Sequence, residues 1–522
     1  MFQMMALVVK YMDLGLISLF AFMGLYLYLV KPRSSVCRDV YAYQLVIIIL
    51  FNFLSFLMIL LKQWETYRIS VLTGQIEKMT MTESAARALE EGSFRGFIRS
   101  IFLPGWFNAD IFVTSILYIF LMSVMYVVLS TVYRHTNRLL WNCVYMLLSV
   151  SFVMLMRLDP EVCRTQVYWM GIGFTVMMVV MLFFKGRWIW KIPAFVFLVL
   201  SVGLIALPFA FPYSAYGALN WVRIGPVTFQ PSEFVKLTFA FYLAVLYTRK
   251  RVTLTLVEAA LVTLVLAGVL LVQNDLGALL IFGILAWMMT YDFTGWSFVL
   301  WGGALVIGIA GLLAYHYVGH VKVRFDIWLN PWEDIDGNGY QIAQSLFAIS
   351  GGGWFGLGLY QGMPGVIPVR TSDMIFSVIA EEMGAGFCIM LLLVYLLMFL
   401  FVMETGRRER NTFRRNLLIA FGVLFIAQTF IIVGGVIKLI PLTGVTLPFI
   451  SSGGSSLLSN FITIAIIEAV IRLYRQDREE ARRRERAREE NAERARAQRN
   501  GGKTRRLKKE PLLEPFDFDD PF

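Results

Sequence analysis

The chain has 522 residues, of which 58% are hydrophobic and 15% aromatic, with a mean hydropathy of +0.66 and a net charge of +11. Soluble domains contain roughly 45–50% apolar residues, so the apolar excess of this chain needs lipid to cover it. The composition therefore excludes an ordinary soluble protein. The positive charge is concentrated between apolar runs and in the C-terminal tail, which indicates membrane topology and not nucleic-acid binding.

Apolar runs of about 20 residues recur along the chain, and each is long enough to cross a bilayer. The sequence therefore predicts an all-α, polytopic membrane protein. The first run is not followed by a small-residue cleavage site, so we interpret it as a retained span. The thirteen predicted spans are 6–30, 42–62, 110–133, 139–157, 166–184, 192–212, 233–248, 253–272, 275–292, 296–318, 373–402, 412–433 and 455–473.

Basic residues lie at every second boundary between these spans, where the positive-inside rule predicts cytoplasmic loops. The pattern puts the N-terminus outside, the C-terminus inside, and the loops 63–109, 213–232 and 319–372 outside. The basic residues are Lys31, Arg33, Arg134, Arg138, Lys185, Arg187, Lys191, Arg249, Lys250, Arg251, Arg407, Arg408 and Arg410.

Charged residues interrupt the middle of the apolar region at two positions. Glu233 and Lys236 are three residues apart, so they share one helix face and can form a local ion pair. Asp275 stands between two short spans, where a helix N-cap is the simplest role. Both positions are also candidates for contact with a polar ligand, because charge at membrane depth is by default functional.

The stretch 351–384 runs from a glycine-rich loop to Asp373, which precedes a long apolar helix containing Glu381 and Glu382. An ionisable group at membrane depth usually faces a polar cavity or a partner. Asp is also a favoured N-cap, so capping of this helix is an equally open role for Asp373.

A second irregular stretch, residues 441–456, carries two prolines and ends in Gly453-Gly454-Ser455-Ser456. Irregular backbone at membrane depth is tolerated only where protein or a water-filled cavity satisfies it. Its free amides precede a helix N-terminus, which is a favourable place for phosphate oxygens. Ser455 and Ser456 are therefore candidate phosphate contacts.

The tail that begins at Arg475 mixes charges of both signs with almost no apolar face. It predicts a solvated helix or a disordered segment near anionic lipid. The acidic and aromatic end, 514–522, is either a docking peptide or plain disorder.

Six strings in order together resemble the shape, elongation, division and sporulation family, whose branches are RodA, FtsW and SpoVE. They cover roughly residues 139–473. The strings are Asn220-Trp221-Val222-Arg223-Ile224-Gly225 with Gln230-Pro231-Ser232-Glu233, then Gln273-Asn274-Asp275-Leu276-Gly277, Gly339-Tyr340-Gln341 with Gln344-Ser345, Trp354-Phe355-Gly356-Leu357-Gly358-Leu359, Asp373-Met374-Ile375-Phe376 with Glu381-Glu382-Met383-Gly384, and Pro441-Leu442-Thr443-Gly444 with Gly453-Gly454-Ser455-Ser456.

The resemblance implies a ten-helix glycosyltransferase core over 139–473, preceded by three extra transmembrane helices in 1–138 and followed by a charged cytoplasmic tail, 474–522. It implies a peptidoglycan glycosyltransferase that polymerises lipid II at the outer face of the bacterial cytoplasmic membrane, beside a class B penicillin-binding transpeptidase. The family's essential aspartate corresponds to Asp373, and its paired polar residues correspond to Glu233 and Lys236.

Several positions depart from the family pattern and leave open the branch: elongation, division or sporulation. Thr371-Ser372-Asp373-Met374 stands where many members have His-Thr-Asp-Phe. Ser452 replaces a common tyrosine, and Ile432 replaces a usual asparagine. The aspartates themselves are kept.

Joining two lipid-linked sugars needs a base for the acceptor hydroxyl, and Asp373 is the candidate. An inverting reaction needs only one such carboxylate. Lys236, Arg223 and Arg370 are candidates to balance the charge of the departing pyrophosphate, and a divalent cation, Mg²⁺ or Mn²⁺, could share that task. Asp275, Glu233, Ser455 and Ser456 complete the predicted substrate-binding set. A lipid II flippase and a non-enzymatic scaffold for a transpeptidase are the alternative functions.

Overall fold

A computed structural model describes residues 2–31, 34–72, 109–133, 136–184, 186, 189–215, 218–225 and 227–499. All thirteen predicted apolar segments lie in helices, and among the described residues eleven helices are long and apolar enough to cross a membrane. These eleven are α1 (Phe2–Val30), α2 (Ser34–Leu72), α5 (Ala109–Thr131), α6 (Arg138–Leu158), α7 (Pro160–Phe183), α10 (Val252–Val272), α11 (Leu276–Thr294), α12 (Ser297–Tyr317), α15 (Ile375–Arg408), α16 (Thr412–Val436) and α17 (Gly454–Arg499). The other two, α8 (Ala194–Ala210) and α9 (Ser232–Leu246), are shorter, with 17 and 15 residues.

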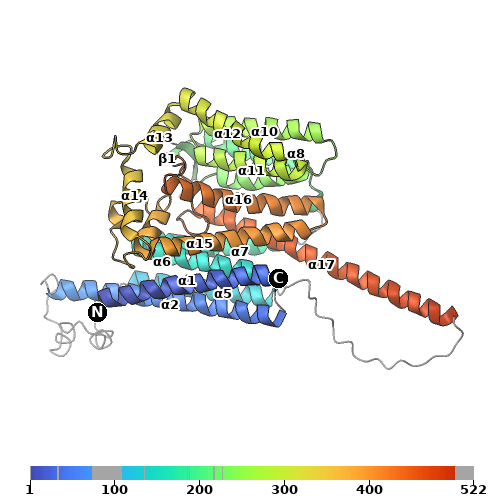
Figure 1. The fold of residues 1–522 in the computed structure, drawn as a ribbon, viewed down its shortest axis with the longest axis horizontal. Helices are drawn as coiled ribbons and strands as arrows, with labels where there is room; N and C mark the ends of the chain where they lie inside the picture. Colours follow the sequence, from blue (N-terminus) through green and yellow to red (C-terminus); the bar gives the residue numbers. More distant parts are fainter. Residues whose placement is uncertain are drawn as a thin grey trace.

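The long helices lie side by side in one bundle, with α1, α2 and α5 along one flank and α8, α10 and α12 along the other (Figure 1). Helix α6 lies between the two groups and packs against α2, α7 and α15. Its side chains are buried from Leu139 to Met156. A helix that is covered on all sides is expected to be largely apolar, and the buried polar side chains of this one, Asn142, Ser149 and Ser151, all have hydrogen-bond partners.

Polar contacts fix the extra N-terminal helices to α6. The Asn142 side chain donates to Gln44 Oε1 of α2 at 3.1 Å, and the Asn52 side chain of α2 donates to Ser149 Oγ at 2.8 Å. The Tyr118 hydroxyl of α5 reaches the same Ser149 at 3.1 Å. Because these groups are buried, breaking one contact leaves an unpaired polar atom, which makes the packing specific.

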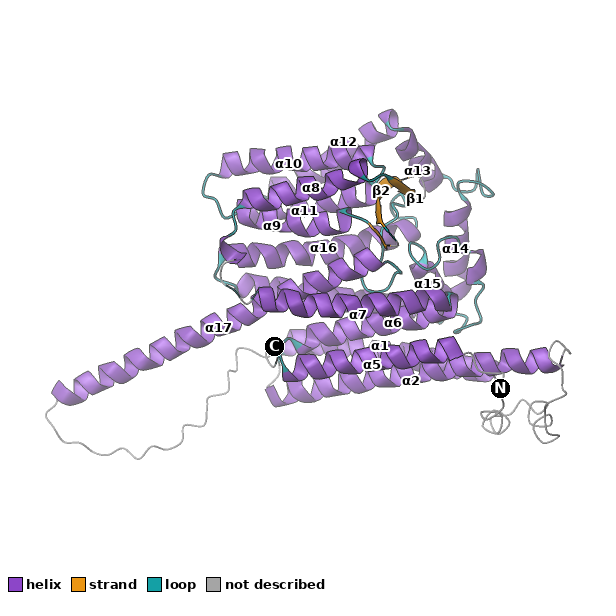
Figure 2. Cartoon of the chain, turned by 180° about the vertical axis from the view of Figure 1, so that it is seen from behind, coloured by secondary structure: helices purple, strands orange, loops and turns teal. Residues whose placement is uncertain are grey.

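The connecting segments gather at one end of the bundle, and α17 leaves from the opposite end (Figures 1 and 2). The gathered segments are α13 (Gly319–Leu329), α14 (Tyr340–Gly352), the short 3₁₀ turn Pro364–Val366 and a small sheet. A second 3₁₀ turn, Ile189–Lys191, precedes α8. The end to which α17 leads also holds the α9–α10 and α15–α16 connections.

Within the described part of the chain, a small sheet and the helices α13 and α14 are additions to the thirteen predicted helical segments. The strands of the sheet are β1 (Tyr213–Ala215), β2 (Ala218–Ile224) and β3 (Val227–Phe229), antiparallel in the order β1-β2-β3. Gly225, with φ 61°, begins the turn between β2 and β3, a conformation that glycine adopts without strain. The alternation of the short strands is too brief to stand out beside the apolar spans.

Helix α17 extends well past its predicted span and runs unbroken to Arg499. Its side chains are mostly buried up to Leu473, and from Ala481 to Ala495 they are exposed. The described part of the tail is thus a solvated helix, one of the two predicted states. The acidic segment 514–522 lies outside the described residues, as do Arg33, Arg134, Lys185 and Arg187, which contributed to the topology prediction.

Helix α15 is broken at Gly384, where the backbone has φ 90° and ψ 166°. The glycine-rich loop inserts at this break. Leu357 N–H donates to Glu381 C=O at 2.9 Å and Gly358 N–H to Glu382 C=O at 2.8 Å, while Gly353 and Trp354 carbonyls accept from Ala385 and Gly386. The loop therefore satisfies the backbone groups that the break frees, as irregular backbone inside a membrane protein requires.

We expect Gly384→Ala to destabilise the protein by more than about 1 kcal/mol, because a non-glycine residue at this φ is strained. Its Cβ would also come within 2.3 Å of the Gly356 nitrogen. The measurement is the melting temperature in detergent. Gly268→Ala in α10, where an added Cβ meets nothing within 4 Å, is the matched control and should leave the melting temperature unchanged or higher. Equal melting temperatures for Gly384→Ala and the parent would contradict the interpretation that the break in α15 requires glycine and is tightly packed by the inserted loop.

Candidate active site

Asp373 lies in the loop before α15, at the end of the bundle where the connecting segments gather. Helix α15 begins at Ile375, its N-cap residue is Met374, and no side chain makes the cap hydrogen bond. The capping role left open for Asp373 is therefore wrong. The loop is instead held by the segment just before α17. Ser451 Oγ donates to Ser372 C=O at 2.7 Å, and Ser452 N–H donates to Thr371 C=O at 2.8 Å.

The carboxyl group of Asp373 is only partly accessible, and a Cβ added at Gly444 would lie 3.4 Å from its Oδ2. Burial raises the pKa of Asp373 to about 6, against the lowering effects of a hydrogen bond from Ser372 and of the charge on Arg324. A carboxylate with a pKa near 6 is still ionised at neutral pH, yet it is more basic than an exposed one.

Arg324, on α13, is a cation whose charge lowers the pKa of Asp373. This residue was not selected from the sequence. Burial lowers the pKa of Arg324, while the charges of Asp373 and Asp275 raise it. Its Nη1 donates to the Leu442 carbonyl at 3.0 Å. An arginine is charged at any accessible pH, so Arg324 places a fixed positive charge close to both aspartates. The sequence marks Arg324 only as a basic residue within 319–372, the loop that was predicted to lie outside.

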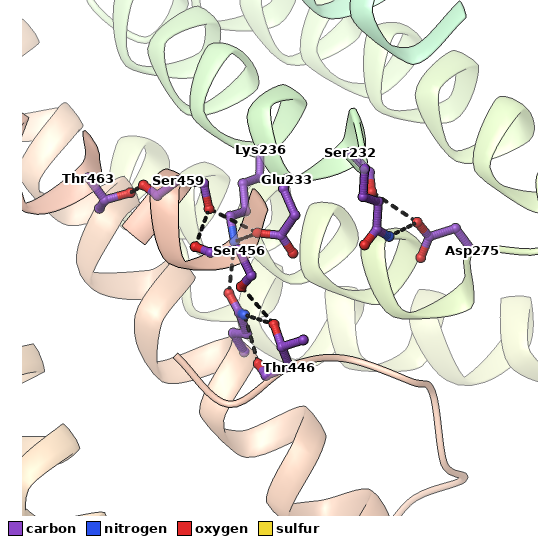
Figure 3. Close-up of polar contacts among 10 residues, drawn as sticks. Ser232, Glu233, Lys236, Asp275, Thr446, Ser456, Ser459 and Thr463 are labelled. Atoms are coloured by element: carbon purple, nitrogen blue, oxygen red, sulfur yellow. Dashed lines mark hydrogen bonds and ion pairs between the residues drawn. The ribbon is translucent and has the colours of Figure 1, made fainter. Parts of the chain in front are cut away.

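Asp275 is the N-cap of α11, which confirms the simplest role predicted for it. Its Oδ1 accepts from Ala278 N–H at 3.0 Å, and its Oδ2 accepts from Asn220, Gln230 and Ser232. Figure 3 shows the contact with Ser232. Both carboxylate oxygens are thus occupied, and Asp275 joins α11 to the β-hairpin and to the start of α9.

Glu233 and Lys236 form a buried ion pair on α9, with Lys236 Nζ 2.5 Å from Glu233 Oε2 (Figure 3). Each partner has a further contact. Ser459 Oγ of α17 donates to Glu233 at 2.9 Å, and Lys236 donates to Gln428 Oε1 of α16 at 3.1 Å. The pair therefore joins three helices, and the predicted local ion pair is confirmed as part of a larger network.

This network continues into the irregular stretch that contains the predicted serines. Gln428 Nε2 donates to the Thr446 carbonyl at 2.8 Å, and the hydroxyls of Thr446 and Ser456 are 2.7 Å apart. Ser455 and Ser456 are both buried in the first turn of α17. The structure thus connects Ser456 to Lys236, while Asp373 lies close to another residue of the same stretch, Gly444.

Glu381 and Glu382 hold the loop that precedes Asp373 and do not face it as a second acid. Glu382 pairs with Arg157 of α6, with 3.0 Å between Nε and Oε1, and its side chain is fully buried. Glu381 Oε1 accepts from Met363 N–H at 2.9 Å. The Arg157 guanidinium also lies over the Tyr360 ring, 4.7 Å from its centroid. These charges fix the path of the chain towards Asp373.

The other two predicted cations lie nearer the surface. Arg223 is exposed on β2, and its Nε donates to the Gly225 carbonyl at 3.3 Å. Arg370 is three residues before Asp373 and its Nη1 donates to the Gly365 carbonyl at 3.4 Å. Both remain predictions as substrate contacts.

Comparison with known proteins gives a match to the family model of cell cycle proteins FtsW, RodA and SpoVE over residues 132–476. The peptidoglycan glycosyltransferase RodA of Mycobacterium tuberculosis is 31% identical over 372 residues, covering 64% of this chain and 78% of the relative. The probable peptidoglycan glycosyltransferase FtsW of Bacillus subtilis is 35% identical over 283 residues, covering 50% and 69%.

A solved structure is also similar. One chain of a peptidoglycan synthase complex, in a study of how polymerization and crosslinking are coordinated, is 25% identical with a TM-score of 0.56. The similarity covers 65% of the present chain and 98% of that one. The helices α1 and α2 precede the residues that the family model matches.

We expect Lys236→Met alone to lower the stability by roughly 3–5 kcal/mol, because it leaves Glu233 charged and buried without its partner. The double variant Glu233→Leu/Lys236→Met should recover most of that loss, since apolar replacement of a buried pair is often neutral. Thermal unfolding in detergent measures both. Equal losses in the single and double variants would mean that the pair does not act as a unit.

Proposed function

Because the chain belongs to the FtsW/RodA/SpoVE family of cell cycle proteins, we propose that it is a membrane-embedded peptidoglycan glycosyltransferase that polymerises lipid II. The observation that carries the proposal is Asp373, a partly accessible carboxylate at the end of the bundle where the connecting segments gather, on which burial and the charge of Arg324 act in opposite directions. Both relatives compared above are named for this activity, which favours an enzyme over the alternative functions.

In this proposal Asp373 takes the proton from the acceptor sugar's hydroxyl as that oxygen attacks the anomeric carbon of the donor. The bond from that carbon to the lipid-linked pyrophosphate breaks, and the pyrophosphate leaves with the electron pair. Attack from the opposite face inverts the anomeric centre, so no covalent sugar–enzyme intermediate is required. A base with a pKa near 6 is suited to this step at neutral pH.

Arg324 is the residue best placed to balance the charge of the departing pyrophosphate, because its charge already acts on Asp373. A guanidinium fork matches phosphate oxygens in two-point contact. We propose Arg223, Arg370, Ser455 and Ser456 as further contacts to the substrate. Lys236 is engaged by Glu233 and Gln428, so it would act on the substrate only by exchanging those contacts.

A divalent cation is also part of the proposal, but the described residues offer no ready cage for it. They contain no group of three or more His, Cys, Asp or Glu side chains that could hold a metal ion. Asp275 is occupied by its four hydrogen bonds, which leaves Asp373 as the one carboxylate of the site with room for a ligand. Mg²⁺ is often bound by one or two carboxylates together with substrate phosphates.

A single assay separates this proposal from the two alternatives. Purified protein, with its transpeptidase partner, is given labelled lipid II in detergent. Glycan chains indicate the enzyme. Translocation of lipid II in liposomes without glycan chains indicates a flippase, and neither result leaves a scaffold. A class B penicillin-binding transpeptidase is the proposed partner, supported by the similarity to a chain of a peptidoglycan synthase complex.

We expect Asp373→Asn to reduce polymerisation by two or more orders of magnitude, the scale of general-base catalysis. The amide keeps the size of the side chain but cannot accept the proton. Glycan yield from labelled lipid II is the readout, and an unchanged melting temperature is the control for folding. Polymer yield near that of the parent would rule out Asp373 as the base.

The same base predicts the pH dependence of the reaction. Since the pKa of Asp373 is raised to about 6, the ionised form decreases as pH falls through 6, and the polymerisation rate should fall with it. Removing the positive charge with Arg324→Gln should move this midpoint upward by roughly one unit or more. Lys322→Gln, an equal charge change at an exposed site on the same helix, should leave the midpoint in place. If the parent and both variants have the same midpoint, the charge of Arg324 does not influence the ionisation of Asp373.

We propose that the protein lies in the bacterial cytoplasmic membrane with its N-terminus outside and its C-terminus inside. The two ends of α1 support this orientation. The ring centroids of Phe2 and Tyr360 are 6.4 Å apart at the end of the bundle that holds the Asp373 loop, and Lys31 pairs with Glu404 at the other end. In a cysteine-free background, an impermeant thiol reagent should label a cysteine at position 340 on intact cells, but not one at 480. Labelling in the reverse order would invert the proposed topology.

A further inference from the structure

A pocket of about 870 Å³ lies at the end of the bundle opposite Asp373. Three separate parts of the chain form it: the end of α1, the connection between α15 and α16, and the extension of α17. Lys31 and the α17 lining beyond residue 476 fall outside the residues that the family model matches. Half of the lining thus belongs to segments that this chain adds to the family core, and half belongs to the core itself.

Basic side chains dominate the lining, with six basic residues against three acidic ones. The acidic residues are Glu409, Asp477 and Glu485. The basic residues are Lys31, Arg408, Arg410, Arg414, Arg478 and Arg482.

The acidic residues do not neutralise this set. Arg414 engages Glu409 at 3.0 Å and also engages Asp477, so one cation occupies two of the three carboxylates. Lys31 and Arg408 both reach Glu404, which is outside the lining. Arg410 is exposed and has no ion-pair partner among the described residues. The pocket therefore retains an excess of positive charge around a cavity, which is suited to an anion.

The position of the pocket indicates which anions can reach it. It lies where α15 and α17 change from buried apolar residues to charged ones, the level at which lipid headgroups meet a membrane protein. A smaller hollow shares Arg408 and Tyr474 with it and is also lined by the apolar residues Phe401 and Ile471. That hollow measures only about 20 Å³ and also contains the Glu404 side chain, so the charged head of a ligand is the part that the pocket can select.

We propose that this pocket is a binding site for a phosphate-bearing anion, whose binding fastens α1 and the extension of α17 to the α15–α16 connection. Arginine forks bind phosphate oxygens in two-point contact, and the lining contains Arg410 from the α15–α16 connection and Arg482 from α17. The phosphate can come from an anionic phospholipid headgroup or from a free phosphate in solution. Anionic lipids in the cytoplasmic leaflet attract basic clusters next to transmembrane helices.

The test uses the full-length protein in an uncharged detergent. Its melting temperature is measured against increasing dioctanoyl phosphatidylglycerol, dioctanoyl phosphatidylcholine or inorganic phosphate, at constant ionic strength. The pocket variant is Arg410→Gln/Arg482→Gln. The control variant is Arg486→Gln/Arg488→Gln, an equal charge change on the exposed part of α17 beyond the lining.

We expect phosphatidylglycerol to raise the melting temperature of the parent and of the control, with its apparent affinity weakened roughly tenfold or more in the pocket variant. That is the loss expected when charge-assisted hydrogen bonds are removed. An equal response to inorganic phosphate assigns the site to free phosphate, and a response to phosphatidylglycerol alone assigns it to lipid. Native mass spectrometry, which counts retained phosphatidylglycerol, provides a second readout if the pocket variant is itself less stable.

Three results would overturn the proposal. The first is the absence of any response to either phosphate compound in the parent. The second is an equal response to phosphatidylcholine and phosphatidylglycerol, which would show no selection for the anion. The third is an equal loss of affinity in the control variant, which would show general attraction to the basic helix and no defined pocket.

Discussion

The insertion of the glycine-rich loop into the break of α15 is the constraint on which the candidate active site depends. At Gly384 the helix ladder is interrupted, and the freed carbonyls and amides are paired by residues 353–358. Unpaired backbone groups inside a membrane protein cost several kcal/mol each, so the loop and the break can exist only together. The buried pair of Glu382 and Arg157 then secures the following residues. The chain reaches Asp373 along a path that is fixed at both ends.

Two polar centres contact the 441–456 stretch at different residues and have different physical characters. The network of Glu233, Lys236 and Gln428 is buried and has its charges paired, so it joins helices α9, α16 and α17. Asp373 is partly accessible, and it lies near a cation that lowers its pKa only in part. Reaction chemistry requires a group that is reachable and not fully satisfied, which distinguishes the second centre from the first.

The extra helices α1, α2 and α5 are integrated with the family core and are not peripheral additions. Besides the contacts to α6, Lys10 of α1 donates to the Gly356 carbonyl at 3.0 Å. That carbonyl belongs to the loop that fills the α15 break. At the other end α1 contributes Lys31 to the basic pocket. One added helix thus contacts both the support of the active-site loop and the proposed anion site.

The membrane class, the thirteen apolar helical segments and the family could be predicted from the sequence, because apolar runs of spanning length and ordered motifs are local properties of the chain. The helices α13 and α14 could not, since they lie in the loop predicted between two spans. The sequence also determined that Glu233 and Lys236 share a helix face, since spacing alone decides that. It could not distinguish a cap from a free carboxylate at Asp373 or Asp275. The structure shows that Asp275 caps α11 and that Asp373 is not the N-cap of α15.

The cation that acts on Asp373 is selected by contacts between distant segments, which the sequence does not reveal. Arg324 is 49 positions away in the chain, and no local pattern connects the two; they meet because α13 folds back over the 437–443 segment, where Trp328 donates to the Lys438 carbonyl at 3.1 Å. The insertion of residues 353–358 at Gly384 and the gathering of Lys31, Arg410 and Arg482 around one cavity are likewise contacts between distant segments. Charge and spacing identify the residues that can take part in a site, but the packing of helices decides which of them come together.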